Sequence, residues 1–289
     1  SYQVSEERAA DETAVLLLNK NQKSVKGLKN FMQKIQNTNR LQGIEESPYF
    51  RTHPVTTERV AFFNDKLNKE KKRNADVAMD ARLKRLQAKL YAYLMPTAAV
   101  LKRYPLSDTS IAGNIAHAVY YMRLKNLNAA LKYADALISA EPKNPYFWEI
   151  KAQTLFENGK LKEAVRAYKQ ALELKPSSEL FKLSYAEAVL AANPTRAEME
   201  ELIPLLEHVN RNRTYPDAYL YLGRIYADMG RVAEADYFAA EYNNAIGETD
   251  IARRQLAKAL KQPLRADIKL RAEDLKVKLA QDEKKNSLF

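Results

Sequence analysis

The chain has 289 residues, 46% of them hydrophobic, and a net charge of +11 at pH 7, which allows two domains or one domain followed by a solenoid. The absence of Cys excludes disulfides and thiolate metal sites, but it leaves the redox compartment open. No apolar run reaches 18 residues, so we expect no transmembrane helix, and the first residues show no signal-peptide pattern and suggest a trimmed or internal start.

The elements expected along the chain are helices. Glycine is scarce, the prolines lie mostly between periodic segments, and β-branched runs are few, which predicts an all-α protein. Residues 3–20 should form a first amphipathic helix with Ser5 as its N-cap, and residues 24–36 a second one. A loop at 37–49 follows, and another helix is expected to begin after Pro54.

Three side chains near the N-terminus have ligand chemistry. Glu7 and Asp11 are four residues apart and therefore share one face of the first helix. His53 comes from a separate element, and zinc accepts both carboxylate and imidazole ligands. By spacing alone, however, acids in a first helical turn are usually caps and a His before Pro is usually a loop residue.

The positive charge is concentrated in two stretches. Residues 60–105 carry eleven Lys and Arg against four acids, and residues 252–289 carry eleven against five. Such stretches are attracted to nucleic acid, anionic membrane or acidic protein, or they are simply solvated helix faces. Interleaved acids and the lack of a nucleic-acid motif favour solvated faces, so we expect no nucleic acid among the partners.

The clearest pattern lies at 145–178. Two helical segments of about a dozen residues are separated at Asn158-Gly159, and the second is ended by Pro176. Small residues at positions 8, 20 and 27 of this stretch let neighbouring helices approach closely. Pro142 precedes Pro176 by 34 residues, which is the period of the tetratricopeptide repeats that the pattern resembles.

Other copies surround this repeat. A charged run and a helix at 76–94 lead into the array. Further repeats are expected at 111–144, at 179–215 and from Pro216, with basic helices at 249–261 and 264–281 closing the array. The third repeat is three residues longer than the period, and we expect its insertion near the sequence NPTRAE that starts at Asn193.

Stacked hairpins form a groove from the first helix of each repeat, and we expect this groove to bind protein or peptide partners. It lacks the paired Lys and Asn that grip a C-terminal carboxylate in chaperone-binding repeats. The predicted partner-binding residues are Met122, Arg123, Tyr146, Glu149, Gln153, Phe156, Glu157, Leu220 and Arg224.

Short motifs near the N-terminus resemble a peptidase family. ERAAD at 7–11 is similar to the ExxAD helix, and FRTHPVTTER at 50–59 to the HP-x-x-x-x-R segment, of the gluzincin metallopeptidases that include HtpX and the CAAX prenyl protease. Their order matches the part of the peptidase domain that follows its HExxH helix. QAKL at 87–90 and PKNPYFWEIKAQTLFENGK at 142–160 resemble the periplasmic, BepA-like branch, in which the peptidase is fused to tetratricopeptide repeats.

The resemblance implies a role for each matching residue. Glu7 falls at the third zinc ligand and Asp11 at the acid that orients a metal-bound His. His53 falls at the histidine above the metal, and Arg59 at the arginine that follows it. The chemistry implied is attack of zinc-activated water on a peptide carbonyl, with the HExxH glutamate as general base.

The sequence departs from the family at a decisive point, because none of its three histidines stands in HExxH. Two zinc ligands and the base are missing, so we expect the chain alone to be inactive and to hold no zinc, whereas the full-length protein would contain zinc. Without the partner helix, residues 1–60 should pack abnormally or pair with a second copy of the chain.

The expected organisation is a peptidase portion at 1–64, a charged linker with connecting helices at 65–110, about four repeats at 111–248 and capping helices at 249–289. The resemblance implies a periplasmic protein whose repeats bind substrates or the outer-membrane assembly machinery in quality control. Two alternatives remain open: a non-enzymatic repeat scaffold for protein binding, and, less favoured, a basic helical protein that binds nucleic acid.

Overall fold

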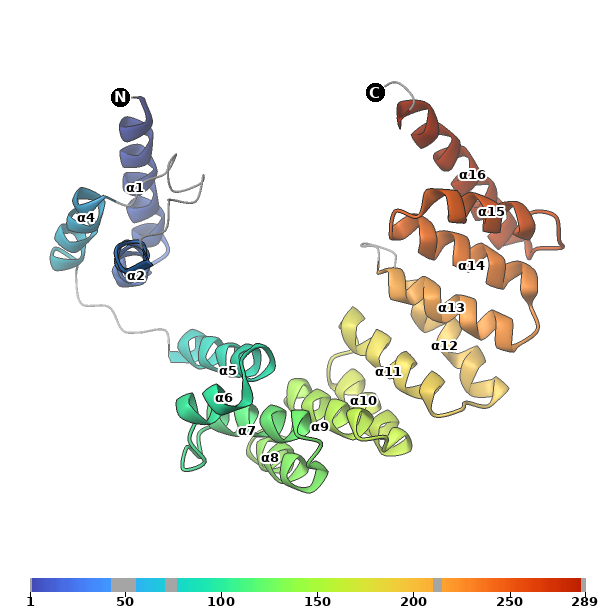
Figure 1. Ribbon diagram of the computed structural model, residues 1–289, viewed down its shortest axis with the longest axis horizontal. Coiled ribbons are helices and arrows are strands. Elements are labelled where there is room, and N and C mark those ends of the chain that lie inside the picture. The colour runs from blue at the N-terminus through green and yellow to red at the C-terminus, as the bar shows by residue number, and fades with distance from the viewer. Residues whose placement is uncertain (1, 43–55, 71–76, 210–214, 287–289) are drawn as a thin grey trace. The chain divides into compact units, whose positions relative to one another are not determined.

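The computed structural model describes residues 2–42, 56–70, 77–209 and 215–286 (Figure 1). These residues form fifteen helices and no strand, which confirms the predicted all-α class. In chain order the helices are α1 (Tyr2–Lys20), α2 (Lys26–Gln42), α4 (Thr57–Asn68), α5 (Val77–Leu94), α6 (Thr97–Arg103), α7 (Ile111–Arg123), α8 (Leu127–Ala140), α9 (Pro145–Glu157), α10 (Leu161–Leu174), α11 (Glu179–Ala191), α12 (Arg196–Val209), α13 (Pro216–Asp228), α14 (Val232–Ala245), α15 (Thr249–Ala259) and α16 (Ala266–Asn286). Within the described ranges, none of these helices has the length and apolar character needed to cross a membrane.

The chain divides into two compact units, an N-terminal unit at Ser1–Ala81 and a C-terminal unit at Arg82–Phe289. The N-terminal unit packs α1, α2 and α4 around a small core (Figure 1). Phe63 of α4 is fully buried there against Val15 of α1 and Val25, and its ring meets that of Phe62 edge to face. Among the described residues this core is small, so polar contacts should contribute much of the stability of this part of the unit.

Capping contacts set the ends of two of these helices. Thr56 caps α4, because its hydroxyl accepts a hydrogen bond from the backbone N–H of Arg59 at 3.3 Å. Glu70, which follows α4, accepts a hydrogen bond from the N–H of Val25 at 2.9 Å, just before α2. The carboxylate of Glu70 therefore ties the C-terminal end of α4 to the N-terminal end of α2.

The C-terminal unit is built from helical hairpins that follow one another in chain order (Figure 1). They pair α7 with α8, α9 with α10, α11 with α12 and α13 with α14, and first helices of neighbouring repeats also touch. Position 8 of the four repeats is occupied by Ala118, Ala152, Ala186 and Gly223. The three alanines are fully buried, because no larger side chain fits where helices approach so closely.

A left-handed residue recurs at the turn inside each hairpin. Position 15 is Lys125 (φ 55°), Gly159 (φ 73°), Asn193 (φ 56°) and Gly230 (φ 75°) in the four repeats. Only glycine adopts this conformation without a steric cost, yet two of the four turns use another residue. The packing of the two helices of each repeat therefore determines the turn conformation, and glycine is not required for it.

The extra length of the third repeat is divided between two places. The turn between α11 and α12 has four residues, 192–195, against three residues in the corresponding turn between α9 and α10. Between α12 and α13 lie six residues, 210–215, against four between α10 and α11. The expected insertion near Asn193 therefore accounts for one residue, and two belong to a segment that lies mostly outside the described residues.

The last two helices close the array with a mixed surface. On α16, Ile268, Ala272 and Leu275 are buried against the core that also contains Tyr226 and Phe238. On the opposite side of α16, Leu270 and Val277 are exposed. α16 thus turns one apolar face inward and leaves scattered apolar residues exposed.

Candidate functional site

One arginine joins two of the predicted site residues in the N-terminal unit. Arg59 donates from Nε to Oδ2 of Asp11 at 2.8 Å and from Nη2 to Oδ1 at 2.7 Å. Its Nη1 lies 2.8 Å from Oε2 of Glu7. All three side chains are largely buried, with 14% of Arg59, 6% of Asp11 and 16% of Glu7 exposed. We call these three residues the carboxylate–arginine cluster.

The sequence explains how the cluster forms. Glu7 and Asp11 lie four residues apart on α1, so both carboxylates project from one face. Arg59 lies in the first turn of α4, which Thr56 caps. A guanidinium fork matches a carboxylate with two parallel hydrogen bonds, and burial in a small core requires such pairing for the charges to be tolerated. The structure therefore brings together Glu7, Asp11 and Arg59, while the roles that the family resemblance implies for them at a zinc site stay predictions.

The fourth member of the predicted site, His53, lies outside the described residues. In the described part of the chain, no three His, Cys, Asp or Glu side chains come together as metal ligands do. The carboxylate of Glu7 is instead bound by Arg59. The described residues therefore do not form a zinc site by themselves, because the carboxylate of Glu7 alone cannot supply the three protein ligands of catalytic zinc.

Of the two described histidines in the C-terminal unit, His208 is exposed on α12 and His117 has a structural role. His117 is fully buried, its Nε2 lies 3.0 Å from the carbonyl oxygen of Tyr104, and its ring lies 4.9 Å from that of Tyr133. Among the described residues it belongs to no group of three or more His, Cys, Asp or Glu side chains that could hold a metal ion. We therefore assign it to packing between α7 and α8.

A second region of interest is the groove of the first two repeats, which α5 occupies. Lys89 of α5 forms an ion pair with Glu149 at 2.6 Å, and the hydroxyl of Tyr93 donates to Oε1 of Gln153 at 2.6 Å. Arg123 donates to the carbonyl oxygens of Ala92 and Met95, both at 2.6 Å. The groove here is filled by the chain itself.

This arrangement corrects the expected role of four groove residues. Arg123, Glu149 and Gln153 hold α5, and Met122 is only 5% exposed in the core that α5 shares with α7 and α9. Residues 76–94 were expected to form a connecting helix, and their contact with the repeats was not predicted. A usable signal was present, since Arg85, Lys89 and Tyr93 recur every four residues on one face of α5.

The other predicted groove residues lie at separate places. Tyr146 is 49% exposed on α9, and Phe156 is half-buried against the neighbouring core. Glu157 forms an exposed ion pair with Lys125 at 3.1 Å. On α13, Leu220 is exposed, and Arg224 donates to the carbonyl oxygen of Leu190 at 3.1 Å. The structure therefore does not gather these residues into one site.

Beyond α5, the repeat face has an acidic and phenolic character. The pKa of Glu187 is raised by burial and by the nearby carboxylates of Asp217 and Glu157. Burial, together with Glu187 and Asp217, also raises the pKa of Tyr221. These residues come from α9, α11 and α13, so carboxylates of successive repeats influence one another. The arrangement suits binding, because no activated nucleophile with an adjacent base is present among these residues.

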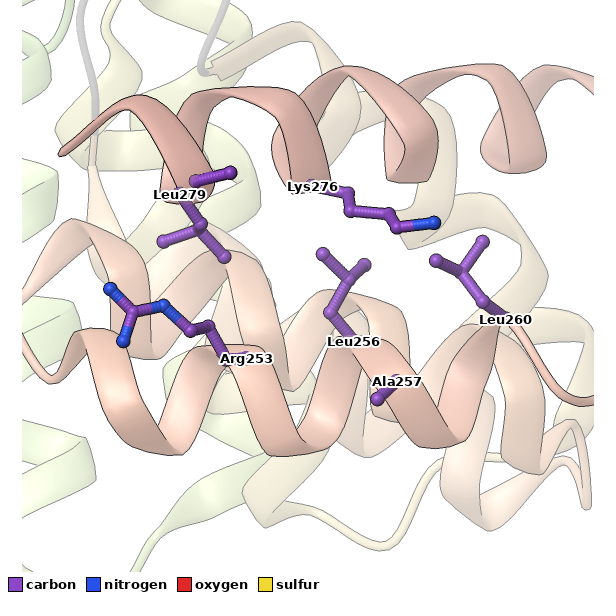
Figure 2. A pocket seen from close by; sticks show the side chains of 7 residues that line it. Arg253, Leu256, Ala257, Leu260, Lys276 and Leu279 are labelled. Atoms are coloured by element: carbon purple, nitrogen blue, oxygen red, sulfur yellow. The ribbon is translucent and has the colours of Figure 1, made fainter. Parts of the chain in front are cut away.

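A cavity of about 350 Å³ opens between the two C-terminal helices. Figure 2 shows Leu256 of α15 and Leu279 of α16 pointing toward one another across it, with Leu260 at one end. Arg253 and Lys276 flank these leucines, and Lys276 lies 3.7 Å from Glu273. The cavity is apolar with basic edges, and it lies far along the sequence from the carboxylate–arginine cluster.

Comparisons with known families assign two parts of the chain. Residues 1–66 match the model of peptidase family M48. Residues 115–179 match the tetratricopeptide repeat. Both resemblances predicted from the sequence are confirmed: the chain joins a segment similar to peptidase family M48 to tetratricopeptide repeats, and such repeats suit protein–protein interaction.

Whole-chain comparisons add little. Comparison with curated proteins gives no match. Among solved structures, a thermophilic tetratricopeptide-repeat protein from Thermus thermophilus is similar, with 20% sequence identity and a TM-score of 0.43. The alignment covers 63% of this chain and 100% of that protein.

Proposed function

We propose that this chain is the C-terminal, partner-binding part of a zinc-dependent metalloendopeptidase. The match of residues 1–66 to peptidase family M48 supports the peptidase assignment, and the repeats support protein recognition. The observation that carries the proposal is the carboxylate–arginine cluster. It places Glu7 and Asp11, the two acids of the family motif, on one buried face and holds them there with Arg59.

In this proposal the chain itself performs no catalytic step. The described residues do not fit a zinc site, and the sequence contains no HExxH motif. The chain holds Glu7 and Asp11 in a fixed position, and its repeats provide a surface that binds other proteins. Arg59 fixes the orientation of both carboxylates, since a guanidinium fork leaves a carboxylate little freedom to turn.

The proposed role of the repeats is to hold substrate or partner proteins near the peptidase. The first groove is already occupied by α5, so the surfaces left for a partner are the rim around Tyr146 and the exposed part of α13 with Leu220. Aromatic and apolar residues with charged neighbours are typical of interfaces. We further propose a periplasmic location and a role in outer-membrane protein quality control, on the resemblance to the BepA-like branch.

The test is to isolate the protein as its own cells make it, with a C-terminal affinity tag. We expect mass spectrometry to find an HExxH segment upstream of the present sequence, bound zinc, and proteolysis of casein that a zinc chelator stops. Glu7→Ala should lower both the zinc content and the proteolysis. Glu12→Ala is the matched control, because Glu12 is exposed on the same helix and pairs only with Arg8 among the described residues. A mature chain that begins near Ser1 and carries no zinc would refute the peptidase assignment.

The location is tested separately. Fractionation of the same cells should place the tagged protein in the periplasmic extract, and deletion of its gene should change the level of assembled outer-membrane proteins. Recovery of the protein only in the cytosolic fraction would contradict this part of the proposal, without affecting the peptidase assignment.

A second candidate function is a repeat scaffold without peptidase activity. The observation in its favour is that Glu7 is bound by Arg59 and that the described residues bring no metal-ligand group together. Under this alternative, Glu7→Ala would alter only the stability of the N-terminal unit and leave the zinc content unchanged. The isolation experiment therefore decides between the two candidates.

A further inference from the structure

A cavity of about 720 Å³ lies where α5 passes the second repeat. Its walls come from α5, α7, the segment before α9, α9 itself and the residue that follows α10. This volume falls in the range of about 300–1,000 Å³ that is typical of ligand sites. The cavity belongs entirely to the C-terminal unit.

The cavity is lined by four cations and one carboxylate. Arg82, Arg85 and Lys89 come from one face of α5, Lys175 follows α10, and Glu141 is the acid. Spacings of three and four residues along α5 explain why its three cations point the same way. The lining alone therefore carries three more positive charges than negative ones.

Two of these cations are neutralised inside the protein. Arg85 donates to both carboxylate oxygens of Glu141, at 2.9 and 2.5 Å, and this bond also lowers the pKa of Glu141. Lys89 pairs with Glu149 at 2.6 Å. The bidentate contact of Arg85 with Glu141 shows that the walls already accommodate a carboxylate.

The other two cations have no carboxylate partner among the described residues. Lys175 donates to the hydroxyl of Tyr146 at 2.6 Å, and its ammonium lies 4.9 Å from the centre of that ring. Arg82 is exposed, and in the described part of the chain it makes no ion pair. Lys175 and Arg82 thus line a partly enclosed space without a carboxylate partner among the described residues. Such uncompensated positive charge favours an anionic ligand.

An apolar floor lies beside these charges. Ile115, Phe147 and Ile150 line the cavity and are only 2–3% exposed over their whole surface. At the rim, Leu86 is 55% exposed, and Leu90 continues its stripe one turn further along α5. A ligand for this site should therefore carry an anionic group next to a bulky apolar one.

We propose that this cavity binds an acidic peptide segment of a partner protein. The side-chain carboxylate of a Glu or Asp is bound by Lys175 and Arg82, and the hydroxyl of Tyr146, which accepts from Lys175, donates to the same carboxylate. A neighbouring apolar side chain of the peptide contacts Phe147 and Leu86. This inference rests on the proposed function, since it names the chemistry by which the repeats recognise proteins.

The geometry favours a peptide over a nucleic acid. Single-stranded nucleic acids bind along open basic grooves with exposed aromatic rings on which bases stack. Here the cations line a single cavity, its floor is aliphatic apart from the buried Phe147, and among the lining residues only Tyr146 presents an exposed ring on which a base could stack. One carboxylate with an adjacent apolar side chain matches these features better.

The test uses the full chain and two fluorescent peptides with blocked ends. One peptide contains Phe-Glu-Phe in a Gly and Ser background, and its twin contains Phe-Gln-Phe, so the pair differs by one charge. Fluorescence anisotropy at low ionic strength should show about tenfold tighter binding of the Glu peptide, as expected for a charge-assisted hydrogen bond. Added salt should reduce this difference.

Variants locate the site. Arg82→Gln and Lys175→Gln should each bring the affinity for the Glu peptide close to that for its twin. Lys84→Gln and Lys169→Gln are matched controls, because these exposed lysines lie on α5 and α10 but do not line the cavity. They should leave the difference unchanged. Circular dichroism is expected to show the same helix content for all four variants, because each changed side chain lies at the surface or at the cavity rim.

Several outcomes would overturn the inference. Equal affinities of the unmodified chain for the two peptides would do so, as would an equal loss in the control variants. Displacement of the Glu peptide by an oligonucleotide that binds more tightly, with the same dependence on Arg82 and Lys175, would assign the cavity to nucleic acid.

A further measurement separates this inference from the proposed function. An unfolded outer-membrane protein should bind the unmodified chain and bind the Arg82→Gln/Lys175→Gln double variant more weakly. Unchanged binding by the double variant would refute the cavity assignment and leave protein recognition intact. No binding by either form would refute protein recognition itself.

Discussion

Arg59 of α4 holds Asp11 of α1 through two parallel hydrogen bonds, with Nε 2.8 Å from Oδ2 and Nη2 2.7 Å from Oδ1. The third nitrogen of the same guanidinium reaches Glu7 at 2.8 Å. One side chain thus neutralises part of the charge of two carboxylates, and it joins α1 to α4 through residues that are 48 positions apart in sequence. The stability of the N-terminal unit should therefore depend strongly on Arg59.

Arg59→Lys should therefore destabilise the N-terminal unit, although the charge is kept. An ammonium cannot make the paired contact with Asp11, whose side chain is 6% exposed, and the loss should be about 2 kcal/mol. Hydrogen exchange of the α1 and α4 amides is the suitable measurement, because the single Trp of the chain, Trp148, lies in the other unit.

The matched control is Arg8→Lys. Arg8 pairs with Glu12 on the same helix, but both side chains are more than half exposed. Exposed pairs of this kind contribute about 0.3–0.5 kcal/mol, so exchange in α1 should hardly change. Equal effects of the two substitutions would show that the fork to Asp11 does not stabilise the unit.

The packing of α5 against the first two repeats gives a second prediction. Tyr93→Phe removes the hydroxyl that donates to Gln153 at 2.6 Å and leaves the ring in place. We expect the cost to be about 1 kcal/mol, and the amides of α5 should exchange faster with solvent.

Tyr121→Phe is the comparison for this variant. The Tyr121 hydroxyl makes no hydrogen bond with the described residues, while its ring stacks on Tyr133 in the same way after the change. Exchange in α5 should stay as in the unmodified chain. If Tyr93→Phe gave the same unaltered exchange, the hydrogen bond to Gln153 would not hold α5 in place.

The recurring left-handed turn gives a third prediction. Gly159→Ala should destabilise the C-terminal unit by about 1 kcal/mol, because Gly159 has a φ of 73°. A Cβ there would meet no atom within 4 Å, so the cost comes from the backbone conformation alone. Urea unfolding followed by Trp148 fluorescence measures it.

Gly223→Ala is the control within the same unit. Gly223 is helical, and a Cβ would make only ordinary contacts at 3.7–3.8 Å. Because alanine favours helix over glycine, stability should be unchanged or higher by up to about 1 kcal/mol. A drop as large as that of Gly159→Ala would show that packing, and not φ, governs both positions.

A fourth prediction concerns pH. The hydrogen bonds from Arg85 hold the pKa of Glu141 below its ordinary value of 4.5. A lowered pKa in the folded protein means that the ionised carboxylate stabilises the fold above about pH 4.5 and that this contribution is lost as the pH falls through the lowered value. The free energy of unfolding of the unmodified chain should thus exceed that of Glu141→Gln near neutral pH.

The difference between the two proteins should vanish in acid, where a protonated Glu141 resembles Gln. Glu173→Gln is the control, because Glu173 is exposed and forms no ion pair within the described residues. Its difference from the unmodified chain should show no such fall with pH. A Glu141→Gln difference that stays constant from neutral pH to acid would contradict the assigned role of Arg85.

Sequence reasoning predicted the repeats well because the information is local. Ala118, Ala152 and Ala186 recur at one position of the period, and each is buried where two helices meet. The break at Gly159 coincides with a left-handed turn. The same turn at Lys125 was invisible to a search for glycine, because there the packing of the two helices, and not the residue type, imposes the conformation.

The candidate site was predictable only in part. Helical spacing places Glu7 and Asp11 on one face, but it contains nothing about Arg59, and only the family resemblance related these three residues. The groove was a general expectation from the repeat pattern. Its occupation by α5 depends on contacts between residues about 60 positions apart, such as Lys89 with Glu149.

By itself, the amino-acid sequence determined the helical class, the repeat period and the positions of the small residues, since each follows from side-chain size and spacing within a single hairpin. Only the tertiary structure decided which charges meet. It paired Arg59 with Asp11, placed Tyr93 against Gln153 and left Lys175 beside an open cavity. Such pairings are selected when burial removes water from charged groups, and that happens only once distant segments have packed together.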